Sequence, residues 1–146
     1  MPENPRQLAR EKIDGMLAAA GWDVQKIKTA NILAAAGVAI GRFPLLSPYG
    51  IADYALYIKG KAAGIIEIKD AGTKLTGVNI GSEKYTHGLP ETLPVWKWPL
   101  PFSYQSTGDE TVFTNNLERS EGPQPIETFH SPEELFHLLG DPEPDA

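Results

Sequence analysis

The chain has 146 residues, a formal net charge of −6 and no cysteine. This length predicts one domain with one core, and the lack of cysteine excludes disulfides and thiolate metal sites. No apolar run approaches the ~20 residues that a membrane-spanning helix needs, and the first residues do not resemble a secretory leader. We therefore expect a cytoplasmic protein without a membrane partner, with a single domain over residues 1–140 and an acidic, disordered tail over residues 141–146.

The first predicted element is a helix that begins after Asn4. Asn4 suits the N-cap, Pro5 suits the first helical position, and Gly21 is placed to end the helix in a left-handed conformation. The apolar residues between them keep helical spacing: Ile13, Met16, Leu17 and Ala20. Residues 22–31 give a mixed signal, so we expect a loop with a short turn there.

The rest of the chain predicts mostly strands. We expect strands at 38–43, 51–58 and 62–69, a weakly helical segment at 78–89, a hairpin of 102–106 with 111–115, and a helix from the capping box Ser131-Pro-Glu-Glu134 to about Leu139. Prolines and tryptophans at 93–101 predict a packed connection, and 118–124 predict a loop. These elements contain an αβββαβ core, and we expect an α/β fold with a central mixed β-sheet flanked by helices.

Charged residues stand inside the two central strands, where alternation places them on a sheet face. Asp53 lies in the first strand, and Glu67 and Lys69 end the second. Burying even a lone polar group without a partner costs roughly 2–7 kcal/mol. We therefore expect these side chains to share a function that offsets this cost.

The connection between these strands decides whether the two acids can meet. A two-residue turn at 60–61 would oppose Asp53 to Ile68 and send Glu67 to the other face, because side chains alternate with period two. A three-residue connection at 59–61 opposes Asp53 to Glu67 and keeps Lys69 on the same side. If the acids form one site, the hairpin must contain an odd loop or a bulge.

Two acids and a lysine at one sheet edge suit metal-dependent phosphodiester hydrolysis. Mg²⁺ prefers oxygen ligands, so Asp53, Glu67 and the backbone carbonyl of Ile68 are the candidate metal ligands, and Mn²⁺ could substitute. A bound Mg²⁺ supplies a nucleophilic water near neutral pH and stabilises the transition-state charge. Lys69 is expected to orient the water or neutralise the phosphate. Asp53, Glu67 and Lys69 are thus the candidate catalytic residues.

A salt bridge is the simpler interpretation of the same residues. A cross-strand pair between Lys69 and one acid at a sheet end would be worth ~0–1 kcal/mol if exposed. This interpretation leaves one carboxylate without a partner. It predicts a small α/β interaction protein in which the charges form a salt bridge. A structure with Lys69 pointing away from both acids would discriminate between this hypothesis and a nuclease.

The charge of the chain is divided between its two parts. Residues 1–108 contain twelve Lys and Arg against nine Asp and Glu, a net +3, whereas residues 109–146 contain one Arg against ten acids, a net −9. A local basic surface can therefore coexist with an acidic chain. Lysines around the hairpin are candidate DNA contacts, namely Lys61, Lys74 and Lys84, although solvated lysines are an equal alternative.

These motifs resemble the N-terminal nuclease domain of type I restriction enzyme R (motor) subunits. The similar segments cover nearly the whole chain: Ala-Ala-Gly21-Trp22, Gly50-Ile-Ala-Asp-Tyr-Ala-Leu-Tyr57, Gly60-Lys-Ala-Ala-Gly-Ile-Ile-Glu-Ile-Lys69, Leu75-Thr-Gly-Val78, Ser82-Glu-Lys-Tyr85, Gly88-Leu-Pro90, Pro101-Phe-Ser-Tyr-Gln-Ser-Thr-Gly108 and Phe113-Thr-Asn115. The resemblance implies the PD-(D/E)XK restriction-endonuclease fold, with Asp53, Glu67 and Lys69 as its catalytic residues.

The resemblance also implies partners. In that family the domain cuts double-stranded DNA after an attached helicase motor has moved the duplex, in a complex with methylation and specificity subunits. The chain has no Gly-x-x-x-x-Gly-Lys-Ser/Thr phosphate loop, so we expect it not to bind ATP by that route. A domain of this family that has lost activity would instead be a catalytically weak or inactive module that binds DNA or partner subunits.

One position departs from the family pattern. The family often carries Gln-x-x-x-Tyr after the lysine; Tyr85 matches the tyrosine, but Gly81 stands at the glutamine position. Glycine costs about 1 kcal/mol inside a helix and offers no side chain to a phosphate. Tyr85 is therefore either a DNA contact or a core residue. Glu11 and Asp14 are candidates for an auxiliary acid, with exposed helix carboxylates as the alternative.

Overall fold

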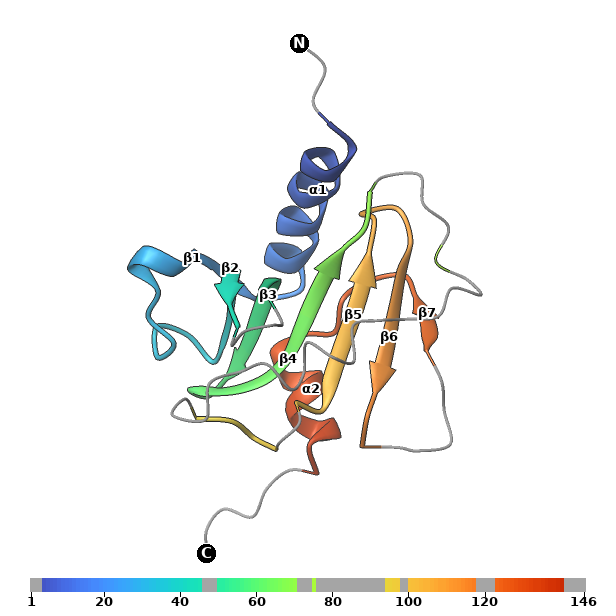
Figure 1. The fold of residues 1–146 in the computed structure, drawn as a ribbon. Helices are drawn as coiled ribbons and strands as arrows, with labels where there is room; N and C mark the ends of the chain where they lie inside the picture. The colour runs from blue at the N-terminus through green and yellow to red at the C-terminus, as the bar shows by residue number, and fades with distance from the viewer. Residues whose placement is uncertain are drawn as a thin grey trace, which may run out of the picture.

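A computed structural model describes residues 4–45, 50–70, 75, 94–97, 100–117 and 123–140. In chain order its elements are α1 (Pro5–Ala19), β1 (Asp23–Lys26), the 3₁₀ helix η1 (Ile27–Thr29), β2 (Gly37–Pro44), β3 (Ile51–Ile58), β4 (Lys61–Ile68), β5 (Phe102–Ser106), β6 (Thr111–Asn115), β7 (Gln124–Ile126) and α2 (Pro132–Leu138). The strands form one seven-stranded sheet in chain order (Figure 1).

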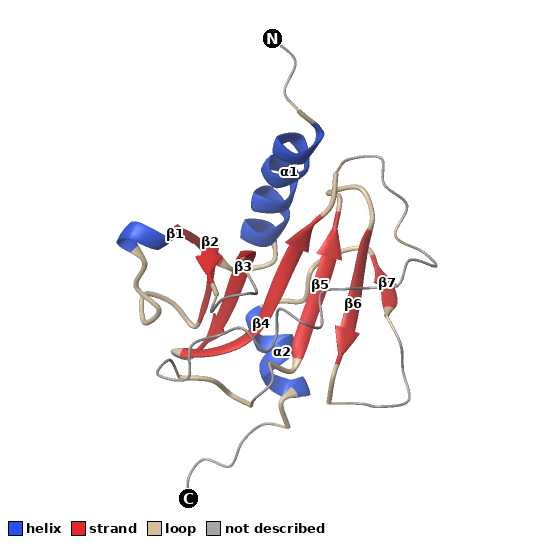
Figure 2. Cartoon of the chain, viewed as in Figure 1, coloured by secondary structure: helices blue, strands red, loops and turns tan. Residues whose placement is uncertain are grey.

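The sheet is mixed, which confirms the α/β class. β1 pairs with β2, and β4 with β5, in parallel, while the other neighbouring strands are antiparallel. Few helices accompany the sheet (Figure 2), and it has more strands than the expected αβββαβ core. Two strands that the sequence did not predict, β1 and β7, form the two edges.

The first helix follows its capping signals. The Asn4 side chain accepts a hydrogen bond from the Gln7 N–H at 2.8 Å, and Gly21 has φ +103° just after the helix, as the sequence predicts. Its buried face consists of Ala9, Ile13 and Leu17. α1 thus lies against the sheet near the end of β4 (Figure 1).

The β3–β4 hairpin contains the predicted irregularity. Ile58 pairs with Lys61 across a two-residue turn, and the register then shifts, leaving Ala63 without an opposed residue. The shift is a β-bulge, and beyond it Tyr54 pairs with Ile66. One further step in this register places Asp53 opposite Glu67. The bulge that the acid pair required is therefore present.

Two apolar clusters cover the two faces of the sheet. Residues of α1 and α2, such as Ile13 and Leu135, pack with alternate β3 side chains and with an aromatic group on β5 and β6. The other cluster lies on β2, β3 and β4 and includes Tyr57, Ile65 and Leu100. Burial raises the pKa of Tyr57 to about 12, as expected for a phenol in this core.

The later elements agree with several predictions. β5 and β6 have the predicted bounds. α2 begins with the predicted capping box, because Ser131 Oγ accepts from the Glu134 N–H at 3.1 Å and Glu134 accepts from the Ser131 N–H at 2.8 Å. Within the described part of the chain, no helix is long and apolar enough to cross a membrane.

Other predictions were incomplete or lie outside the described residues. The expected loop at 22–31 contains the strand β1 and the helix η1, and the end of the loop expected at 118–124 begins β7. The helical segment 78–89 lies outside the described residues, as do Lys74, Gly81, Lys84, Tyr85 and the tail 141–146. These predictions stay untested.

Candidate active site at the open end of the hairpin

We call the end of the β3–β4 hairpin that holds Asp53, Glu67 and Lys69 the open end. Asp53 is the most buried of the three, with a side chain only 10% exposed. One Arg6 Nη atom donates to both carboxylate oxygens at 2.7 and 2.8 Å, and Arg10 donates to one of them at 3.2 Å. Two arginines of α1 therefore neutralise this buried acid.

The Asp53 carboxylate also completes the sheet where its backbone pairing stops. The last residue pair between β3 and β4 is Tyr54 with Ile66, although both strands continue. The Ile68 N–H donates to Asp53 Oδ2 at 2.8 Å, whereas the next N–H, of Lys69, donates to the Ser106 carbonyl on the other side at 2.9 Å. The side chain thus takes the place of a backbone acceptor, which fixes its position.

A cation already lies where the metal ligands were predicted. The same Arg6 guanidinium that contacts Asp53 donates to the carbonyl of Ile68 at 2.9 Å. Two of the three predicted metal ligands, the Asp53 carboxylate and the Ile68 carbonyl, therefore converge on one positive group. This donor set suits Mg²⁺, which prefers carboxylate and carbonyl oxygens.

Glu67 has different partners from Asp53. Lys69 Nζ lies 3.2 Å from one Glu67 oxygen, and Gln105 Nε2 donates to the other at 3.2 Å. Gln105 stands next to Glu67 in the β4–β5 register. Among the described residues, Gln105 Oε1 and Ser103 Oγ are buried without a hydrogen-bond partner. The sheet face beside Glu67 therefore offers polar atoms with remaining hydrogen-bonding capacity.

The two acids face one small hollow. A cavity of about 50 Å³ is lined by Arg6, Asp53 and Glu67, together with neighbouring residues of β3 and β4. Each acid nevertheless has its own cation, because Asp53 pairs with arginines and Glu67 with Lys69. The salt-bridge interpretation therefore leaves no carboxylate over, and Lys69 does not point away from both acids.

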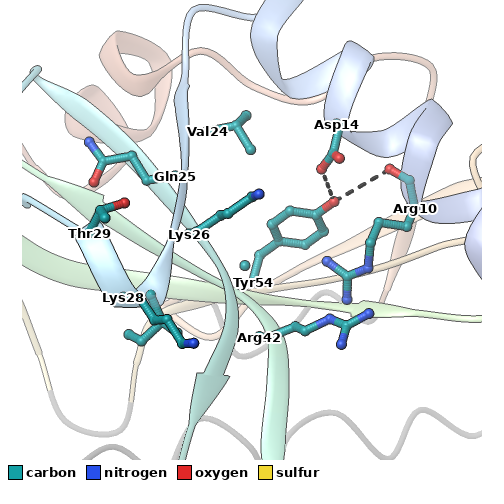
Figure 3. A pocket seen from close by; sticks show the side chains of 11 residues that line it. Arg10, Asp14, Val24, Gln25, Lys26, Lys28, Thr29, Arg42 and Tyr54 are labelled. Carbon is teal, nitrogen blue, oxygen red and sulfur yellow. Dashed lines mark hydrogen bonds between the residues drawn. The ribbon is translucent and has the colours of Figure 1, made fainter.

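The auxiliary acids lie on the α1 side of this site. Asp14 accepts a hydrogen bond from the Tyr54 hydroxyl (Figure 3). Burial, followed by the Asp14 hydrogen bond, raises the pKa of Tyr54 far above its ordinary value. A hollow of about 590 Å³ is lined by both candidates, Glu11 and Asp14, and by Asp53. Either acid is thus near the site.

Lys61 does not belong to this site. It begins β4, six residues before Glu67, which is about 20 Å along an extended strand. Its Nζ lies 4.9 Å from the centre of the Trp96 ring instead. Within the described part of the chain, no three acids or histidines gather as a metal cluster, so the Ile68 carbonyl is needed to reach three protein ligands.

Sequence reasoning missed Arg6, Arg10 and Gln105. The two arginines carry a weak signal, since a spacing of four residues puts both on one face of a helix. Gln105 carries none of its own, because only the parallel β4–β5 register brings it to Glu67.

No family model, curated protein or solved structure matches the chain. The family resemblance of the sequence therefore stays a prediction. The contacts at the open end carry the functional argument.

Proposed function

We propose that this chain is a Mg²⁺-dependent DNA endonuclease domain with a restriction-endonuclease-like fold, related to the nuclease domain of type I restriction R subunits. One observation carries the proposal: the Asp53 carboxylate and the Ile68 carbonyl converge on a single cation, beside a hollow that Glu67 also lines. A site built to hold a positive charge with oxygen atoms suits a divalent metal.

Asp53, Glu67 and the Ile68 carbonyl would hold the metal. Bound Mg²⁺ supplies a nucleophilic water and charge stabilisation for phosphodiester hydrolysis. Lys69, 3.2 Å from Glu67, would place a positive charge beside the phosphate. Gln105 would act as a positioning residue, because its amide donates to Glu67 and limits the rotation of that side chain.

The proposed partners follow from the family resemblance. Double-stranded DNA would be the substrate, a helicase motor region would deliver it, and methylation and specificity subunits would complete the assembly in the cytoplasm. Mn²⁺ would replace Mg²⁺, and ATP would be bound by the motor rather than by this chain.

The first test measures cleavage and metal binding separately. Purified protein is incubated with plasmid DNA and Mg²⁺ or Mn²⁺, and Mn²⁺ binding is followed by calorimetry. We expect Asp53→Asn and Glu67→Gln each to lower cleavage at least ~100-fold, because several kcal/mol of transition-state stabilisation depend on the metal. Mn²⁺ affinity should fall in the same variants.

Glu127→Gln is the matched control, because this exposed carboxylate follows β7, an edge strand that β5 and β6 separate from β4. It should leave both measurements unchanged. Undetectable Mn²⁺ binding by the parent protein, together with uncut DNA, would refute the nuclease assignment.

A second candidate is a nuclease-fold module that binds DNA or partner subunits without cutting. Arg6 favours it, because the guanidinium neutralises Asp53 without any metal. DNA binding without measurable Mn²⁺ binding would support this candidate over the endonuclease.

A further inference from the structure

A second, larger hollow lies between α1, β1, η1 and β2 (Figure 3). Its volume is about 740 Å³, and four of the described residues that line it are cations: Arg10, Lys26, Lys28 and Arg42. We call it the basic hollow. Asp14 is its one acid among these residues, so the lining carries a net charge of +3.

Little in the described part of the chain offsets this charge. Arg10 is paired with Asp53, but Lys26, Lys28 and Arg42 form no ion pair with another described residue. Asp14 accepts the hydrogen bond of the Tyr54 hydroxyl, and Figure 3 shows both groups in the wall of the hollow. A concentration of positive charge on a chain of net −6 attracts an anionic partner locally.

Arg42 is held in an unusual backbone conformation. Its φ is +53°, in the left-handed region, which costs a residue with a side chain roughly 1–2 kcal/mol. The residue lies between Gly41, which pairs with Tyr54, and Phe43, which pairs with Ala52, so it stands beside Asp53 in β3. Strain of this kind tends to collect at binding sites.

The basic hollow continues into the open end. The hollow of about 590 Å³ that contains Arg6 and Asp53 shares three lining residues with it: Arg10, Asp14 and Arg42. An extended ligand could therefore pass from Lys28 along Arg42 to Asp53. This path favours a polymer over a single small anion.

The lining favours contact with the backbone of such a polymer over contact with bases. The aromatic ring among the described lining residues belongs to Tyr54, which is fully buried and bonded to Asp14. It therefore offers no exposed face for base stacking. Arginine and lysine along an open hollow are the usual contacts to phosphates, which bind without reading sequence.

We propose that the basic hollow binds the sugar–phosphate backbone of the DNA strand next to the scissile phosphate, with Lys26, Lys28 and Arg42 as phosphate contacts. The proposal deepens the nuclease assignment and rests on it for the identity of the ligand. It assigns DNA binding to the β1 edge of the sheet, beside α1 and η1, rather than to the turn of the β3–β4 hairpin, where Lys61 lies.

Duplex binding in EDTA tests this proposal without any cleavage. The probe is a fluorescein-labelled duplex oligonucleotide, followed by anisotropy over a range of salt concentrations. We expect the double variant Lys26→Gln/Lys28→Gln to bind about tenfold more weakly, and the slope of log K against log salt to become shallower by about 2. Lys26→Arg/Lys28→Arg should restore both values.

The matched control is Lys59→Gln/Lys61→Gln, which removes the same charge at the turn end. Equal losses in the two double variants would overturn the proposal, as would failure of the parent protein to bind the duplex. Polyglutamate that competes with DNA at equal charge would show a general anion surface and would also overturn it. Lys26 and Lys28 are exposed, so we expect the double variant to fold, and an unchanged thermal unfolding curve checks this. If the curve of the double variant changes, the single variant Lys28→Gln is measured in its place.

This experiment can fail independently of the nuclease assignment. Tight, lysine-dependent binding by a protein that neither binds Mn²⁺ nor cuts DNA would uphold the basic hollow and refute the metal site. Cleavage that is lost in Glu67→Gln but kept, with full DNA affinity, in the double lysine variant would do the reverse.

Discussion

The two ends of the β3–β4 hairpin use the same strands in opposite ways. At the turn end, Lys59 and Gly60 make a tight turn. Lys59 Nζ lies 4.5 Å from the centre of the Phe136 ring, and Lys61 Nζ lies 4.9 Å from the centre of the Trp96 ring. At the open end the ladder stops early, and a buried carboxylate accepts hydrogen bonds from two arginines and a backbone N–H. The turn end is held by cation–π contacts and apolar packing, whereas the open end is an ionic network.

This difference teaches where the fold needs its polar residues. Asp53 accepts the Ile68 N–H, but apolar packing of the hairpin does not require a buried carboxylate there, and a buried ionic network carries the desolvation cost of several charges. The bulge at Ala63 aligns Asp53 with Glu67, and without the bulge the alternation would separate them. The open end thus departs from efficient packing in a way that a binding site would explain.

The strongest test of this contrast removes the centre of the network. Asp53→Ala leaves Arg10, whose side chain is only 20% exposed, and the Ile68 N–H without their acceptor. Unpairing a buried charge costs about 3–5 kcal/mol, and solvent around the half-exposed Arg6 reduces this to about 3 kcal/mol. Urea unfolding should report this loss.

The matched substitution is Asp109→Ala, which breaks the exposed ion pair with Lys12. It should cost less than about 1 kcal/mol. If both aspartates prove equally dispensable, the open end is an ordinary surface pair and the contrast disappears.

The packing at the turn end can be tested with a glycine in β2. Gly37 pairs with Ile58 next to the turn, and a Cβ there would lie far inside van der Waals contact of the Pro132 ring and 3.1 Å from Trp22. Gly37→Ala should therefore loosen α2 and lower the free energy of unfolding by about 2 kcal/mol. Urea titration followed by tryptophan fluorescence measures it.

Gly41→Ala in the same strand is the control for Gly37→Ala. A Cβ at that position meets its nearest neighbour, Arg10, at an ordinary 3.5 Å, so the unfolding curve should hardly move. A loss at this position as large as at Gly37 would mean that a methyl group added at either glycine of β2 destabilises the protein and that α2 packing is not the cause.

Arg6 sharpens the comparison by linking it to the proposed metal. Its guanidinium covers the Asp53 oxygens and the Ile68 carbonyl, so a metal at those atoms must displace it. Arg6→Gln should therefore raise Mn²⁺ affinity up to about tenfold, which corresponds to 1.4 kcal/mol. Calorimetric titration of the apoprotein measures this change.

Lys12→Gln controls for the general change of charge, because it lies on the same helix but pairs with Asp109. It should alter Mn²⁺ affinity much less than Arg6→Gln does. A weaker affinity in Arg6→Gln would show that the arginine supports the metal instead of competing with it.

The sequence predicts those parts of the molecule that are determined by residues close together in the chain. Both helices begin at their capping residues, and the parity argument correctly required a bulge in the hairpin. β1 could not be predicted from its own four residues, because none is buried and its pairing with β2 is parallel. β7 contains Pro125 and is an edge strand of three residues, which gives little local signal.

The candidate site divides in the same way. The positions of Asp53, Glu67 and Lys69 follow from strand alternation, which the sequence contains. The contact of Arg6 with Asp53 joins residues 47 apart in the chain through a long side chain, and only the packing of α1 on the sheet determines it. The basic hollow depends equally on this packing and on β1, so sequence periodicity could not indicate it.

A smaller effect on the free energy of unfolding should come from the protonation of His130, which lies beside Tyr104 of β5. Nδ1 of His130 lies 2.8 Å from the buried Tyr104 hydroxyl, and the two groups share a hydrogen bond. Burial raises the pKa of Tyr104, so its hydroxyl stays protonated over the pH range tested. Burial lowers the pKa of His130, only partly opposed by the Glu134 carboxylate. Below pH 6.5 the unfolded chain thus binds a proton that the folded chain refuses, and stability falls as the pH falls.

Because the His130 ring is only half-buried, the total loss should stay below about 1 kcal/mol. Urea unfolding at pH 7 and pH 5 measures it, and His130→Gln should remove this part of the pH dependence, since an amide can hydrogen-bond to Tyr104 as donor or acceptor but does not titrate. The open end should not share this response, so Asp53→Asn should leave the His130 part unchanged. If the parent protein instead gains stability as the pH falls through this range, the folded state binds the proton more tightly than the unfolded chain, and the direction of the His130 pKa shift is wrong.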